Sequence, residues 1–172
     1  MAGEPDRGVA VKEGDWIVIA SHGWHDSALG VGLVARGPGH SSNAVLLYVF
    51  GPFAERPPET TLATLRPDDN LMVCLMHAGP IAEGRLPIIW HDAEFSRDRW
   101  SVPWFSVSSE IPGAHIDAVR TSDDDPFDVV ETRPVSLQDA RALPEYAAIS
   151  YSAILEKLEN PDLPLPRLSD RF

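Results

Sequence analysis

The residues from Asn43 to Phe53 read Asn-Ala-Val-Leu-Leu-Tyr-Val-Phe-Gly-Pro-Phe, the longest apolar run of β-favouring residues in the chain. Valine and aromatic side chains fit a pleated surface that is packed on both faces. Proline cannot donate a hydrogen bond to a sheet, so Gly51-Pro52 is predicted to end the run. We therefore predict that this stretch forms the central strand of a sheet.

Two further apolar runs precede this strand, separated by short turns rich in Gly, His and Ser: Asp15 to Ser21 and Ala28 to Arg36. Three consecutive strands with short connections predict an antiparallel meander. Gly30 and Gly32 lie inside the second run, where glycine is typical of a bulge, a bend or a close approach by another backbone. We therefore expect strong curvature there.

Short apolar segments follow the meander. Leu71 to His77 and Leu86 to His91 are predicted as strands, and Pro87 favours an edge position or a bulge for the second. Two more runs, 105–109 and 114–121, are predicted to pair as a hairpin around Ile111-Pro112-Gly113. Asp123-Asp124-Asp125-Pro126 lacks the spacing of a calcium loop and is predicted to be a solvated turn.

The C-terminal part has helical signals. Ser136 is a typical N-cap for a short helix that ends near Leu143, and apolar residues at spacings of three and four predict a longer helix from Pro144 to Glu159. One face of that helix is apolar, so we expect it to lie on the sheet. The predicted fold class is mostly β (α+β): a strongly curved antiparallel sheet or partly open barrel, packed by a C-terminal helix.

The length of 172 residues and the 44% hydrophobic content predict one domain of ordinary globular composition. We expect a disordered N-terminus over residues 1–10, a single domain over 11–160 and an extended Pro-rich tail over 161–172. No apolar run reaches the roughly 20 residues that span a bilayer, and the first residues do not resemble a secretory signal. Cys74 is the only cysteine. Together these features predict a cytoplasmic protein.

Charge is the strongest functional indication in the sequence. The formal net charge is −12, which disfavours binding to nucleic acid or to anionic membranes. Residues 110–162 hold 12 acids and four bases. We predict an acidic surface that binds a basic protein partner; the simpler alternative is that the acids provide solubility. The residues assigned to this surface are Asp117, Asp123, Asp124, Asp125, Asp128 and Glu131.

Two pairs of potential metal ligands occur at a spacing of three: His22 with His25, and Cys74 with His77. Together they would supply the four ligands of a zinc site. However, residues three apart on a strand point to opposite faces, so Cys74 and His77 are not expected to reach one ion. We therefore predict no bound metal and no cofactor.

Aromatic residues gather between Trp90 and Phe105. Trp90, Trp100, Trp104 and Phe105 form either part of a core or a stacking groove for a ligand, with Arg97 and Arg99 near enough to hold an anion. We favour the core. The chain contains no Gly-x-Ser-x-Gly, Walker or His-Glu-x-x-His motif, so no catalytic signature is present.

Several Gly, Pro and aromatic positions resemble the bacterial immunity-protein-26 family over roughly residues 12–158. They are Gly14-Asp15, Gly30 to Val34, Tyr48-Val49-Phe50-Gly51-Pro52, Gly84 to Ile89, and Trp100 with Pro103 and Phe105. Leu86 stands where the family has a Trp before Pro87. The resemblance implies a mostly β fold with a terminal helix. It also implies a role in polymorphic toxin systems as an antitoxin that binds its cognate toxin.

Three functions follow as hypotheses. The first is a non-enzymatic immunity protein that binds a toxin through the acidic surface. The second is a metal-dependent hydrolase, because some members of the family carry a phosphotriesterase label; it would use His22, His25, Cys74 and His77 with a carboxylate such as Asp26. The third is a small-ligand binding module built on the Trp90, Trp100 and Trp104 cluster.

Overall fold

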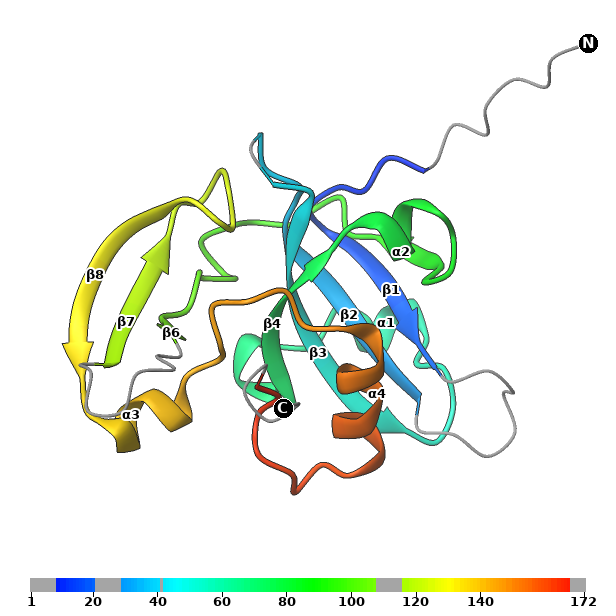
Figure 1. Cartoon of the computed structure of the whole chain (residues 1–172). Coiled ribbons are helices and arrows are strands. Elements are labelled where there is room, and N and C mark those ends of the chain that lie inside the picture. Colours follow the sequence, from blue (N-terminus) through cyan, green and yellow to red (C-terminus); the bar gives the residue numbers. More distant parts are fainter. Residues whose placement is uncertain (1–8, 21–28, 41, 108–115, 168–172) are drawn as a thin grey trace, which may run out of the picture.

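Two antiparallel sheets form the frame of the protein in a computed structural model, which describes residues 9–20, 29–40, 42–107 and 116–167. Within these residues one sheet has five strands in the order β4-β3-β2-β1-β5, and the other has three in the order β6-β7-β8. Figure 1 shows the second sheet, at the left, beside the first. The strands are β1 (Asp15–Ile19), β2 (Leu29–Arg36), β3 (Ala44–Phe53), β4 (Met72–His77), β5 (Ile88–His91), β6 (Phe105–Val107), β7 (Ile116–Thr121) and β8 (Val129–Val135).

The mostly β (α+β) fold and the meander are confirmed, because β1 to β4 pair in sequence order and neither sheet closes into a barrel. The prediction for β3 needs two corrections. β2, not β3, occupies the middle of the first sheet. The strand also continues past Gly51-Pro52 to Phe53, which pairs with Leu29 across an irregularity in the register. β5 lies at a sheet edge, as Pro87 predicts.

Short helices connect or cover the strands: α1 (Glu59–Leu62), the 3-10 turn η1 (Pro67–Asp69), α2 (Gly79–Ala82), α3 (Leu137–Ala142) and α4 (Tyr151–Glu159). α3 begins after Ser136, whose hydroxyl accepts a hydrogen bond from the Asp139 amide, as predicted. α4 begins at Tyr151 rather than at Pro144, because Ser150 caps it through the Ala153 amide. No helix in the described ranges is long and apolar enough to cross a membrane.

Residues 144–149, predicted to be helical, instead form an extended linking segment between the two sheets. The Ser106 amide donates to Pro144 O, and the Tyr146 amide donates to Ser106 O, both at 2.8 Å. Three residues later, the Ile149 amide donates to Leu75 O at 2.7 Å. The linking segment therefore covers the edge of β6 with one end and the edge of β4 with the other.

The first sheet is buried on both faces. α4 packs on one face, where a Cβ at Gly30 would lie 2.6 Å from Leu158 Cδ1. The same Cβ would lie 3.1 Å from Phe50 O, and the register between β2 and β3 shifts at this position, so the predicted irregularity and backbone approach at Gly30 are confirmed. The other face carries Trp16 and Tyr48, which share a core cluster with Phe105 and Val119 of the second sheet. The two sheets are therefore joined by a common core as well as by the linking segment.

Candidate protein-interaction site

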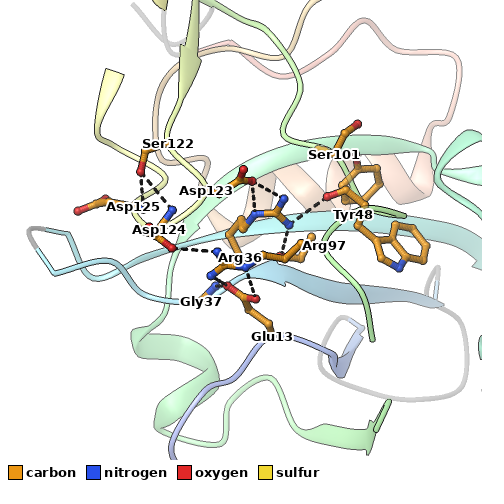
Figure 2. Close-up of polar contacts among 12 residues, drawn as sticks. Glu13, Arg36, Gly37, Tyr48, Arg97, Ser101, Ser122, Asp123, Asp124 and Asp125 are labelled. Atoms are coloured by element: carbon orange, nitrogen blue, oxygen red, sulfur yellow. Dashed lines mark hydrogen bonds and ion pairs between the residues drawn. The ribbon is translucent and has the colours of Figure 1, made fainter. Parts of the chain in front are cut away.

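Arg36, at the end of β2, connects the first sheet to the second through hydrogen bonds. Its side chain is almost fully buried, and its Nε and Nη2 donate to Asp123 Oδ1 at 2.9 and 2.5 Å. Its Nη1 donates to the carbonyl oxygens of Ala35 at 2.6 Å and Trp100 at 3.0 Å. Figure 2 shows Arg36 reaching across to Asp123, which lies in the connection between β7 and β8. We call this connection, residues 122–128, the β7–β8 turn.

A second arginine adds an exposed contact to the same turn. Arg97 donates to both carboxylate oxygens of Glu13 at 2.9 and 2.8 Å, and to Asp124 Oδ1 at 2.9 Å (Figure 2). These hydrogen bonds raise the pKa of Arg97 above its ordinary value. Because the three side chains are at least partly exposed, this network orients the turn more than it stabilises the fold.

Asp125 anchors the turn from inside. Its side chain is buried, and Oδ1 accepts hydrogen bonds from Ser42 Oγ at 2.8 Å and from the Phe127 amide at 2.9 Å. A Cβ at Gly39 would lie 2.2 Å from Asp125 Cγ, so the β2–β3 connection packs directly on this carboxylate. The prediction of a solvated turn is therefore wrong at Asp125, which does not belong to an exposed acidic surface.

Two further side chains, Ser122 and Tyr146, complete the β7–β8 turn with three hydrogen bonds. Ser122 Oγ accepts the amides of Asp124 at 3.1 Å and Asp125 at 3.0 Å. At the other end, the Tyr146 hydroxyl donates to Phe127 O at 2.6 Å. Burial, together with the nearby Asp125 and Asp128 carboxylates, raises the pKa of Tyr146, so its hydroxyl keeps its proton. The turn is thus held by a side chain of the first sheet, by side chains of neighbouring connections and by Tyr146 of the linking segment.

The predicted acidic residues fall into different environments around this turn. Asp123 and Asp124 are exposed, with 63% and 82% of their side-chain surfaces accessible, although each pairs with an arginine. Asp128 is exposed, and Asp117 is half-buried on β7. Glu131, on β8, pairs with Arg120 at 2.8 Å. Arginines therefore offset part of the negative charge that the sequence places here, and the Arg36 contact was not predicted.

The predicted aromatic cluster is divided between two faces. Trp90 stacks on Trp16 with ring centroids 6.5 Å apart, and Trp100 contacts Trp16 edge-on at 6.4 Å. Phe105 is fully buried in the same core. Trp104 points elsewhere, with the Arg133 guanidinium 4.1 Å from its ring centroid.

Arg97 and Arg99, which the alternative of a stacking groove would use to hold an anion, already have protein partners. Arg97 binds Glu13 and Asp124, and Arg99 Nη2 donates to Leu65 O at 2.6 Å. These contacts compete with any anion for the guanidinium donors of both residues.

The structure separates the two described members of the predicted metal-ligand set. Cys74 is buried, and burial raises the pKa of its thiol to about 12, whereas His77 is exposed. The opposite-face prediction for this pair is therefore confirmed. His22, His25 and Asp26 lie outside the described residues. Within the residues that are described, no group of three or more His, Cys, Asp or Glu side chains is arranged to hold a metal ion.

No family model matches the chain, and neither a curated protein nor a solved structure matches it. The resemblance to the immunity-protein-26 family stays a prediction.

Proposed function

We propose that this protein is a bacterial immunity protein that neutralises a basic toxin in the cytoplasm by binding it through the β7–β8 turn. The observation that carries the proposal is the defined geometry of this turn, which presents exposed Asp123, Asp124 and Asp128 and is held by hydrogen bonds from Arg36 on β2, from Arg97 and from Tyr146 of the linking segment. A preorganised surface loses little conformational entropy on binding. It is therefore suited to recognition of a folded partner.

The electrostatics of the chain support the same proposal. The net charge of −12 attracts a basic protein over a distance of about one Debye length and raises the association rate at low salt. Arg36 and Arg97 orient the carboxylates without removing the overall excess of acids. The resemblance to a family of toxin-binding immunity proteins agrees with a binding role.

The test is capture of the partner from the native host on tagged protein at physiological and high salt, with mass spectrometry of the bound material. We expect one stoichiometric basic protein that is released at high salt. A turn variant, Asp124→Lys with Asp128→Lys, should lose this protein. A control variant, Glu55→Lys with Glu59→Lys, makes the same charge change in the segment that follows β3, outside the β7–β8 turn. This variant should still capture the protein.

Two results would contradict the proposal. Retention of the same protein by the turn variant would show that the β7–β8 turn is not the binding surface. Capture of no protein, with turnover of a phosphotriester by the purified chain, would favour the hydrolase hypothesis instead.

A further inference from the structure

β8 is the one strand of the second sheet that has an exposed outer edge along the described chain. β7 pairs on both sides, and the linking segment covers β6. Six of the seven residues of β8 are exposed, including Val129 at 39% and Val130 at 56%. An unpaired strand edge is a template for strand addition unless something blocks it.

The position of Pro134 fixes which backbone groups of β8 point outward. Proline has no N–H, so the opposed residues Asp117 and Pro134 cannot exchange two hydrogen bonds. The flanking pair Ala118–Arg133 therefore does so, and the alternation of an antiparallel ladder turns the N–H and C=O of Thr132 away from β7. Thr132 is thus ready to pair with another strand.

The sequence of this edge is complementary to itself. β8 reads Val-Val-Glu-Thr-Arg-Pro-Val, with Thr132 at the fourth of its seven positions. If a second β8 pairs antiparallel about Thr132, each Glu131 lies opposite an Arg133. Centring the pair on Glu131 or on Arg133 would instead bring like charges together, which is unfavourable.

From this complementarity, we propose that two copies of the chain associate through antiparallel pairing of β8 about a two-fold axis at Thr132, forming one continuous six-stranded sheet. The two Thr132 residues exchange backbone hydrogen bonds, and each Glu131 lies between Arg120 of its own copy and Arg133 of the other. Glu131 and Arg133 occupy a position without backbone hydrogen bonds, where opposed side chains are closest.

The contact is short. The irregularity in the register near Val130 and the missing donor of Pro134 limit the strand that can pair. A contact of this size belongs to the weak class of interfaces, so we expect a dissociation constant on the order of 100 µM. The proposal concerns self-association and does not depend on the toxin-binding role.

Sedimentation velocity from about 10 µM to about 1 mM tests the proposal. The wild-type protein should move from the mass of one copy, 18.8 kDa, towards twice that mass as concentration rises. Glu131→Arg and Arg133→Glu each place like charges in opposition and should weaken association at least about tenfold. An equimolar mixture of the two variants restores both opposite-charge pairs and should form a heterodimer.

Net charge supplies an internal control. Glu131→Arg makes the chain less negative and so weakens the general repulsion between two copies. If net charge alone mattered, association would increase, whereas strand pairing predicts a decrease. Glu55→Arg makes the same charge change away from β8 and should not weaken the dimer. A wild-type protein that stays monomeric at every concentration would overturn the proposal. Pro134, Glu131 and Arg133 would then be residues that prevent pairing at the edge of β8. Two variants that stay monomeric when mixed would also overturn the proposal.

Discussion

Arg36 is the residue on which the position of the β7–β8 turn depends most. Its guanidinium is buried, while its carboxylate partner Asp123 is largely exposed. Substitution of Arg36 would therefore leave a carboxylate that water can solvate, whereas substitution of Asp123 leaves a buried charge. Removing Asp123 leaves a buried positive charge with only the carbonyl acceptors of Ala35 and Trp100 among the described residues. Such a charge destabilises the folded state, because it has lost its hydration and has no counter-charge.

We predict that Asp123→Ala lowers the free energy of unfolding by about 1 to 2 kcal/mol, a value reduced by the exposure of the carboxylate. Asp128→Ala removes an exposed acid from the same turn and should change it by less than about 0.5 kcal/mol. Urea unfolding of both variants measures the difference. Equal effects would show that the Arg36 contact does not hold the turn.

Cys74 gives the protein a dependence on alkaline pH. Burial raises its pKa from the ordinary value of 9.0 to about 12, so the folded state keeps a proton that the unfolded state releases between these values. Stability from this group is therefore complete below about pH 9 and is lost as the pH rises towards 12. Tyr48 and Tyr151, whose pKa values burial also raises, add to the loss at higher pH.

We predict that the free energy of unfolding of the wild-type protein falls by roughly 1 kcal/mol more than that of Cys74→Ala between about pH 8 and pH 10. Denaturant titrations at the two pH values measure both changes, and any constant cost of the substitution cancels. Identical pH dependence in the two proteins would mean that the thiol has the same pKa in the folded and unfolded states, and would contradict the shift that burial causes.

At the scale of elements, the contact between Gly30 on β2 and Leu158 on α4 fixes the helix against the first sheet. A methyl group at Gly30 would lie 2.6 Å from Leu158 Cδ1 and 3.1 Å from Phe50 O, and Leu158 is fully buried. Such contacts are too short to be accommodated without displacing the helix or the side chain.

We predict that Gly30→Ala lowers the free energy of unfolding by about 1 to 3 kcal/mol. Leu158→Ala alone should cost about 2 to 5 kcal/mol, and the double variant should cost less than the sum because the new methyl group occupies space that the leucine vacates. Gly79→Ala, where the nearest atom would be 3.7 Å away, serves as control. Additive costs would contradict the contact.

The sequence predicts the elements of the first sheet well, because its strands are apolar runs bounded by Gly, Pro and polar turns. It does not predict β8, since both faces of that strand are exposed and no alternation of apolar and polar residues remains. The sequence predicts a helix for the linking segment because Pro144 suits the first turn of a helix and apolar residues recur after it at spacings of three and four. Hydrogen bonds to the edges of β4 and β6 override that preference.

The candidate site was only partly predictable for a different reason. The acids of the β7–β8 turn are evident as a run of three aspartates, but their partners are distant in the chain: Arg36 and Asp123 are 87 positions apart. No local pattern reports such a pairing. The available signal was an arginine that ends an otherwise apolar strand, a position that requires a counter-charge if the side chain is buried.

At the scale of the whole molecule, the second sheet is an appendage that the first sheet holds in a defined orientation. The linking segment joins their edges, the core cluster that contains Trp16 and Phe105 joins their faces, and Arg36 joins the end of β2 to the β7–β8 turn. These contacts hold the β7–β8 turn and the outer strand β8 in a defined position relative to the first sheet, and Figure 1 shows β8 at the left, on the side of the second sheet away from the first. This arrangement suits a surface that binds other proteins.

The most direct test of the binding role is growth protection. The protein captured from the host would be expressed in a second bacterium, alone and with each form of this chain. We predict that it arrests growth, and that the wild-type chain and the Glu55→Lys, Glu59→Lys control restore growth while the Asp124→Lys, Asp128→Lys turn variant does not. Equal protection by the turn variant, or no protection by the wild-type chain, would contradict the account.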